Sequence, residues 1–245
     1  HSQDSKANPY NRFSASVNLG SSNYFRESLN QINTPNFLNN TLNSSVSFSK
    51  TFRGYPSVNI SLTASHSQNT RSKTVNLVLP TFQGNVERVY PFVKKNGQKK
   101  GFFKNINLQY SFRGENRINT TDSLFFKKGM FDDAKYGMKH SIPVSTNFKV
   151  LKHLSVSMNG NFDEIWTGNT INRTDYNTST QEQSEKIKIK GFDRFNQYNF
   201  GMSVGTTIYG LFNFKENSKI QSIRHVIRPS VSYNIRPSFK KYYDT

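Results

Sequence analysis

The sequence predicts an all-β protein, an antiparallel up-and-down transmembrane β-barrel of which these 245 residues supply an incomplete portion of about nine strands. Apolar residues recur at every second position in segments of about ten residues, the length that crosses a bilayer as a tilted strand. The connections between these segments tend to alternate between long and short, as in outer-membrane barrels. Bacterial single-chain barrels have even strand numbers, so an odd count indicates an incomplete barrel.

The composition agrees with a barrel and argues against helical membrane spans. Only 33% of the residues are hydrophobic and the mean hydropathy is -0.71, and no run of about 18 apolar residues exists. A transmembrane strand needs an apolar residue only at alternate positions, so a polar composition does not exclude a barrel. The 21 Phe and 12 Tyr residues favour strands over helices. The net charge of +18 indicates anionic partners, whether nucleic acid, phospholipid or lipopolysaccharide phosphates.

The first three strands are predicted over residues 13–19, 42–52 and 58–64. The second and third are the clearest, because their apolar side chains keep one parity while Ser, Asn and Thr occupy the other. The apolar positions of this pair are Leu42, Val46, Phe48, Phe52, Val58, Ile60, Leu62 and Ala64. A short Arg-Gly-Tyr-Pro turn at 53–56 separates them, which predicts a hairpin.

The next two strands are predicted over 75–90 and 106–112. In the first, the apolar parity slips at Pro80 and resumes at Phe82. Because proline cannot donate to the ladder, such a slip is typical of a β-bulge. In the second, Ile106, Leu108 and Tyr110 alternate with polar residues.

Four further strands are predicted over 140–150, 154–162, 198–208 and 227–235. The first two are separated by a turn of about Leu151 to His153, which indicates a second tight hairpin. The last carries Ile227 to Ile235 on one parity and arginine or polar residues on the other, beginning at Arg224.

The predicted layout has three parts. Residues 1–10 are expected to be a flexible lead-in, 11–236 the partial barrel, and 237–245 the start of the next loop or a tail. Long outer loops are predicted near 21–41, 114–137 and 167–190, so that odd-numbered strands rise outward and even-numbered strands return. Residues 1–10 lack a basic start and an apolar run, so an exported protein is expected to have lost its signal or to be longer than this chain.

Basic residues on the polar parity are the candidate functional residues. A charge on the lipid face near the midplane costs about 2–4 kcal/mol, so the parity predicts that these side chains face the lumen. They could contact a glycolipid phosphate or a partner, or they could simply be solvated or ion-paired. The predicted residues are Arg12, Arg113, Lys139, Lys149, Arg224, Arg228 and Arg236.

The sequence predicts no catalytic, cofactor-binding or metal site, and therefore no enzyme. There is no cysteine, which excludes a disulfide framework and a thiolate site. The histidines are dispersed without zinc-binding spacing. Asp163 and Glu164 are adjacent on a predicted strand, so they point to opposite faces and are not expected to share a substrate.

Five short runs resemble the LptD family of outer-membrane lipopolysaccharide-assembly proteins. Residues 223–233 (IRHVIRPSVSY) resemble the strand pattern RHvixPxvxY of that family. The supporting runs are VNLVLP at 75–80, RVYPF at 88–92, KHSIP at 139–143 and TTIYG at 206–210.

The resemblance implies a part of the barrel, in the bacterial outer membrane, through which lipopolysaccharide reaches the outer leaflet. It also implies an LptE-like plug lipoprotein, periplasmic bridge components, outer-membrane lipid around the barrel, and a lateral opening between the first and last strands. The paired cysteines of the family are missing here. No cofactor and no nucleic-acid partner are expected on this reading.

Two alternatives stay open. One is a different outer-membrane barrel, a porin or nutrient transporter, which would show ion conductance with solute selectivity. The other is a secreted basic β-protein that binds polysaccharide or nucleic acid, which would be soluble and bind with a steep salt dependence.

Overall fold

The computed structural model describes residues 1–4, 6–20, 41–94, 97–99, 101–132, 134–151, 153–173, 186–215, 220–239 and 242. The strands are β1 (Asn11–Ser16), β2 (Thr41–Phe52), β3 (Val58–Asn69), β4 (Thr74–Val89), β5 (Asn107–Thr121), β6 (Lys135–Val150), β7 (Leu154–Arg173), β8 (Lys186–Gly205), β9 (Ile208–Asn213), β10 (Ser222–Ile227) and β11 (Ser230–Ile235). Two short helices accompany them, α2 (Gly101–Lys104) and the 3₁₀ helix η2 (Lys128–Phe131). Among the described residues, none of the helices has the length and apolar character to cross a membrane.

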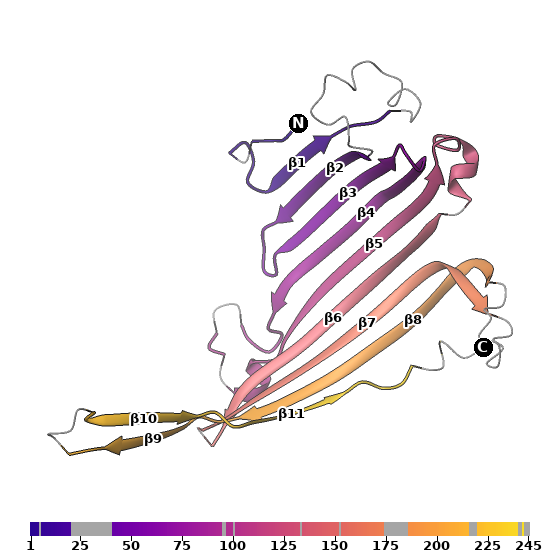
Figure 1. Cartoon of the computed structure of the whole chain (residues 1–245). Coiled ribbons are helices and arrows are strands. Elements are labelled where there is room, and N and C mark those ends of the chain that lie inside the picture. Colours follow the sequence, from indigo (N-terminus) through magenta and orange to yellow (C-terminus); the bar gives the residue numbers. More distant parts are fainter. Residues whose placement is uncertain are drawn as a thin grey trace.

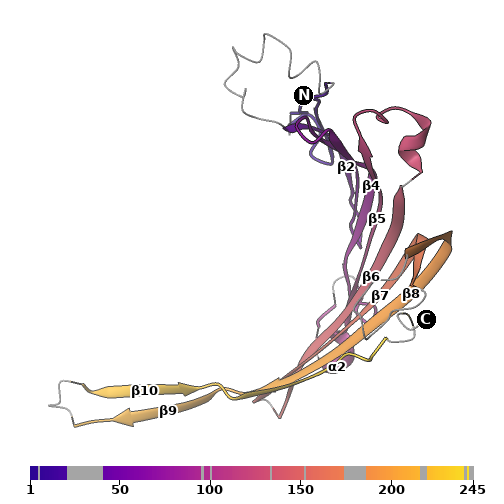
Figure 2. The same ribbon diagram turned by 45° about the vertical axis from the view of Figure 1, so that its right-hand side comes forward.

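Nine of the strands form one antiparallel sheet in the order β1-β2-β3-β4-β5-β6-β7-β8-β11 (Figure 1). The sheet is a single curved layer, with β1 at one edge and β11 at the other (Figure 2). The prediction of an all-β antiparallel sheet of nine strands is confirmed. Over the described ranges the sheet is open, since β1 and β11 do not pair with each other.

The register places apolar and polar side chains on opposite faces of this layer. One row across β1 to β4 contains Phe13, Phe48, Leu62 and Phe82, and the neighbouring row contains Arg12, Ser49, Ser61 and Gln83. We call the two sides the apolar face and the polar face. The four apolar side chains of the first row are 37–47% exposed, so no second sheet covers them as it would in a soluble sandwich.

The predicted bulge at Pro80 is confirmed. Thr63 of β3 pairs with Thr81 of β4, whereas Ser65 pairs with Val78. Between these two pairs β4 therefore contains one more residue than β3, which is a β-bulge. The same irregularity occurs where β4 pairs with β5. The extra residue restores the apolar side chains of β4 to the apolar face after the slip in parity.

The connections divide between the two ends of the sheet. We call the end of the sheet where β1, β3, β5 and β7 finish the loop end, and the end where β2, β4 and β6 finish the turn end. Because each strand is antiparallel to the next, successive connections must alternate between these ends. The strands that precede the three long predicted loops, β1, β5 and β7, therefore finish at the same end.

Two of those loops are shorter than predicted. β5 continues to Thr121 and β6 starts at Lys135, while β7 continues to Arg173 and β8 starts at Lys186. The predicted boundaries at 114–137 and 167–190 were wrong because apolar residues are sparse where β5 and β7 end, with Ile118 and Ile171 as isolated exceptions. Backbone pairing persists without apolar side chains, as the pair Arg117–Lys135 shows. The loop predicted at 21–41 lies outside the described residues, except that Thr41 begins β2.

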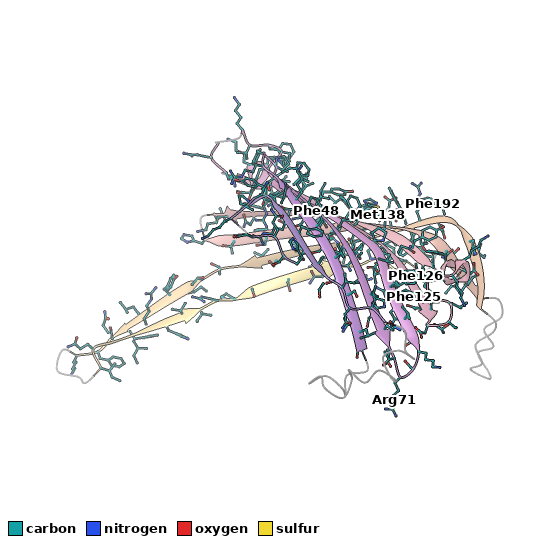
Figure 3. The ribbon with its side chains drawn as sticks, turned by 90° about the horizontal axis from the view of Figure 1, so that it is seen from above. Phe48, Arg71, Phe125, Phe126, Met138 and Phe192 are labelled. Atoms are coloured by element: carbon teal, nitrogen blue, oxygen red, sulfur yellow. The ribbon has the colours of Figure 1, made fainter. Side chains whose placement is uncertain are left out.

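A hydrophobic core lies at the loop end, on the apolar face. It consists of the buried side chains Val75, Leu77, Ile118 and Met130, with Leu79, Phe125 and Ala134 packed against them. The β5–β6 connection, residues 122–134, supplies Phe125 and Met130 and therefore folds over β4 and β5. His66 of β3 stacks on Phe125, with ring centroids 5.5 Å apart. Figure 3 shows Phe125 beside Phe126, whose rings lie 4.1 Å apart.

The first three residues of the predicted lead-in pair with the outer edge of β1. Gln3 N donates to Phe13 O at 2.9 Å, the amino terminus of His1 donates to Ala15 O at 2.7 Å, and Ser2 bridges Ser14. These bonds satisfy backbone groups that an edge strand would otherwise leave to solvent.

The last predicted strand is also interrupted. Residues 222–227 form β10, residues 230–235 form β11, and β10 pairs with β9 in a separate two-stranded sheet. Pro229 lies at the break and has no N–H for the ladder. We call residues 206–207 and 228–229, which join the hairpin to β8 and β11, the hinge. The carbonyl of Pro229 accepts a hydrogen bond from Thr206 N at 3.1 Å, which links the two segments of the hinge. The β9–β10 hairpin projects beyond the turn end (Figures 1 and 3).

Candidate functional site

The polar face contains a hollow of about 880 Å³ that spans β1 to β6. Arg12, Arg113 and Lys139 line it, and they come from three strands that are far apart in the sequence. The register explains why they meet, because one row runs from Arg12 through Ser49, Ser61 and Gln83 to Arg113 and Lys139. Three of the seven predicted basic residues therefore share one site.

A second hollow of about 650 Å³ adjoins the first toward the loop end. Its basic side chains are Arg113, Arg117, Lys135, Lys139, Lys188 and Lys190. Four of these, Arg117, Lys135, Lys188 and Lys190, were missed because their segments were predicted to be loops. Their alternate spacing, 188 and 190 above all, was the signal that could have placed them on one strand face. We call the six side chains the basic cluster.

Ion pairing leaves the basic cluster positive. Glu115 accepts from both neighbouring arginines: Arg113 Nη2 lies 3.1 Å from Oε2, and Arg117 Nη2 lies 2.7 Å from Oε1. The two arginine side chains are 61% and 55% exposed, so N–H donors of each guanidinium group remain accessible from solvent. One carboxylate cannot neutralise two guanidinium groups, and exposed pairs of this kind contribute only about 0–1 kcal/mol. The arrangement can therefore attract an anion.

Lys139 forms a second pair with Asp163, at 2.9 Å between Nζ and Oδ2. Asp163 also accepts a hydrogen bond from Ser141 Oγ at 2.6 Å. Glu164 lies on the opposite face, where it accepts from Trp166 Nε1 at 2.8 Å. The prediction that Asp163 and Glu164 point to different faces is confirmed.

The other predicted basic residues lie apart from this site. Lys149 pairs with Ser155 at the turn end, and Arg236 follows β11 and donates to Gln197 Oε1 at 3.4 Å. Arg228 lies in the hinge between β10 and β11. Arg224 lies on β10 with its guanidinium 4.7 Å from the centre of the Tyr209 ring, outside the nine-stranded sheet. Its predicted place on the polar face of one continuous last strand was wrong because the chain breaks at Pro229.

A comparison with protein families matches residues 1–245 to the family described as LptD protein. The chain belongs to the LptD protein family. None of the curated proteins and none of the solved structures matches it. The resemblance drawn from five short runs is thus confirmed. The LptD family acts in lipopolysaccharide transport and assembly and belongs to the bacterial outer membrane.

The apolar face of this LptD-family sheet carries a cluster of rings with polar atoms. Tyr110 Oη lies 2.7 Å from His140 Nδ1, and the His140 ring lies 4.2 Å from the Trp166 ring. Glu164 accepts from Trp166, and Arg194 lies 4.0 Å from Glu164. Aromatic rings with a polar end are typical of the level where a membrane meets water.

The β4–β5 connection of the LptD-family chain carries lysines at the turn end. Lys99 Nζ lies 3.6 Å from the centre of the Tyr90 ring, while Lys95 and Lys100 lie outside the described residues. Burial would raise the pKa of Tyr90, but the side chains of Arg88 and Lys99 hold it below its ordinary value of 10.0. The connection is therefore locally cationic.

In the part of the chain that the structure describes, no three His, Asp or Glu side chains gather as metal ligands would. The chemistry that the basic cluster can perform is recognition of anionic groups. Guanidinium and ammonium donors suit phosphate oxygens, which accept charge-assisted hydrogen bonds.

Proposed function

We propose that the chain is part of a transmembrane barrel of the outer membrane that passes lipopolysaccharide to the outer leaflet. In this proposal the apolar face meets the hydrocarbon, the polar face lines a wet interior, and the loop end faces outward. The observation that carries the proposal is a single-layer sheet with an exposed apolar face and a basic cluster on the other face. Family membership supports the same role.

The path of the apolar side chains across the sheet supports a membrane setting. On β3 the apolar run covers Val58 to Ala64, and on β7 it covers Leu154 to Phe162. The row that starts at Ile60 passes Gly84, Phe112 and His140 and reaches Glu164, which lies beyond the β7 run. The apolar band thus crosses the rows obliquely. An oblique band is expected for a membrane barrel, because its strands tilt by about 35–45° while the hydrocarbon layer stays parallel to the membrane plane.

The ring cluster around His140 and Trp166 then lies at the margin of the band nearer the loop end. Trp166 and Tyr110 keep their polar atoms bonded there, as side chains at a membrane interface do. At the loop end, the β5–β6 connection covers the part of the apolar face that lies outside the apolar band, around Val75 and Ile118. The covered core explains why apolar residues such as Val75 are needed outside the hydrocarbon.

The basic cluster is proposed to bind the phosphate groups of lipopolysaccharide during passage. Phosphate oxygens would contact Arg113, Arg117 and the lysines, while the neighbouring Ser, Asn and Gln side chains of the polar face would meet sugar hydroxyls. The LptE-like plug lipoprotein and the periplasmic bridge components are proposed partners. Passage needs no covalent step, so the proposed role is transport.

A double substitution tests this role of the cluster. Lys135→Gln with Lys190→Gln is expected to weaken lipopolysaccharide binding at least about tenfold, because each charge-assisted hydrogen bond contributes about 1.5–3 kcal/mol. The measurement is titration of the purified protein in lipid nanodiscs, with Lys149→Gln as a control at the turn end. Equal affinities for all three proteins would contradict the proposal. Ion conductance with solute selectivity and no lipopolysaccharide binding would support a porin instead.

A further inference from the structure

The β9–β10 hairpin exposes apolar side chains on both of its faces. Ile208 and Phe212 of β9 share one face with Ile223 and Ile227 of β10, and the other face presents Tyr209, Leu211 and Val226. These side chains are 38–64% exposed, and Phe214 and Ile220 extend the apolar surface toward the tip at 51% and 57%. The nine-stranded sheet differs, since its polar face carries Ser, Asn and Arg in β1 to β4.

Such a ribbon is not expected to be stable in water. An isolated two-stranded hairpin is marginal by itself, and stability requires further strands or packing on a hydrophobic face. A contiguous apolar surface of this kind marks an interaction site. The hairpin therefore requires surroundings that cover the apolar side chains on both of its faces.

The charges of the hairpin indicate what that surrounding is. Over residues 206–229 the sequence has four cations, Lys215, Lys219, Arg224 and Arg228, and one acid, Glu216, so the segment carries a net positive charge. Arg224 lies against the ring of Tyr209, so its aliphatic stem covers apolar surface while its charged head stays accessible. Apolar side chains with cations at their margins match a lipid surface with anionic headgroups.

The position and the bend of the hairpin agree with a surface location. The apolar runs of β8 and β11 end at Val204 and Val231, and the polar hinge follows directly. Thr206 Oγ1 donates to His153 O at 2.8 Å, which fixes the hinge to the β6–β7 turn. Beyond the hinge the hairpin bends away from the direction of β8 (Figure 2).

We propose that the β9–β10 hairpin is a membrane-surface anchor, lying in the headgroup region of the leaflet at the turn end and binding anionic phospholipid. Within the described residues, β9 and β10 pair only with each other, so the outer edge of each strand is open. These open edges decide whether the hairpin lies on the membrane or enters its core. Unpaired N–H and C=O groups are too costly in hydrocarbon, whereas water reaches them in the headgroup region. This inference rests on the membrane setting of the proposed function.

The experiment uses the absence of cysteine from the chain, which allows one fluorophore to be placed at a single introduced cysteine. Labels are placed at Leu211 and Phe212 on the two faces of the hairpin, at Leu62 on the apolar face of the sheet, and at Ser61 on its polar face. The protein is reconstituted into phosphatidylethanolamine–phosphatidylglycerol vesicles that contain lipids with brominated acyl chains. We expect quenching at Leu211, Phe212 and Leu62, each at least twofold greater than at Ser61.

The two proposals fail differently in this experiment. If Leu62 is quenched no more than Ser61, the membrane setting of the sheet is wrong. If Leu62 is quenched but Leu211 and Phe212 behave like Ser61, the sheet lies in the membrane and the anchor does not exist.

A charge variant tests the lipid class. Arg224→Gln with Arg228→Gln, carrying the Leu211 label, is expected to lose at least half of the quenching in anionic vesicles. Little change is expected in vesicles of phosphatidylcholine alone, where the quenching starts lower. Equal quenching of the variant and the parent in anionic vesicles would overturn the assignment of anionic headgroups.

Discussion

Ile118→Ala is expected to lower the free energy of unfolding by about 2–5 kcal/mol, the range for emptying a filled core position. Ile118 is 1% exposed and belongs to the core cluster with Val75, Leu77 and Met130. Its loss leaves a cavity between β5 and the connection that folds over it. The measurement is guanidinium unfolding of the reconstituted protein, followed by the fluorescence of its single tryptophan, Trp166.

The control is Ile171→Ala, which removes the same atoms from a side chain that is 54% exposed. Its expected effect is within about 0.5 kcal/mol. A second measurement follows trypsin cleavage at Lys127 and Lys128, which lie in the connection beside Met130. Faster cleavage in Ile118→Ala alone would show that the connection docks on this core, and equal stability losses in both variants would contradict the core.

Leu62→Arg is expected to destabilise the membrane-inserted state by about 2–4 kcal/mol, because a charge on the lipid face must be carried into hydrocarbon. Leu62 lies in the row between Phe48 and Phe82, and its side chain is 47% exposed. The same unfolding measurement in phosphatidylcholine vesicles gives the difference from the parent protein.

Ser61→Arg is the matched control, since it introduces the same residue one position away on the polar face. Its expected cost is well below that of Leu62→Arg, because the row neighbours of Ser61 on that face, Ser49 and Gln83, are polar. A cost at Leu62 as small as that at Ser61 would mean that both faces meet water, and the barrel proposal would then be wrong. The comparison therefore tests the two faces of the sheet and not only the stability of one strand.

The local pattern was sufficient for most of the strands. Alternation over 42–52 and 58–64 predicted β2 and β3, and the slip at Pro80 predicted the bulge in β4, because both depend on neighbours along the chain. Strand ends were less predictable. Where apolar residues are sparse, as around Arg117 and Lys135, only the pairing of the two strands shows that the ladder continues.

The candidate site was partly predictable for the same reason. Parity alone selected Arg12, Arg113 and Lys139 as residues of one face. It could not show that they lie in one row, since that depends on the register of six strands. Arg224 was misplaced because the break at Pro229 moves it from the sheet to the hairpin.

The sequence by itself determined the class of structure, the two chemically different faces and the family, because alternation and short motifs are properties of neighbouring residues. Tertiary structure decided which cations share a hollow, which apolar residues a loop covers, and where a hairpin leaves the sheet. These features depend on hydrogen-bond register and chain direction between strands that are distant in sequence, and no local pattern records such pairings.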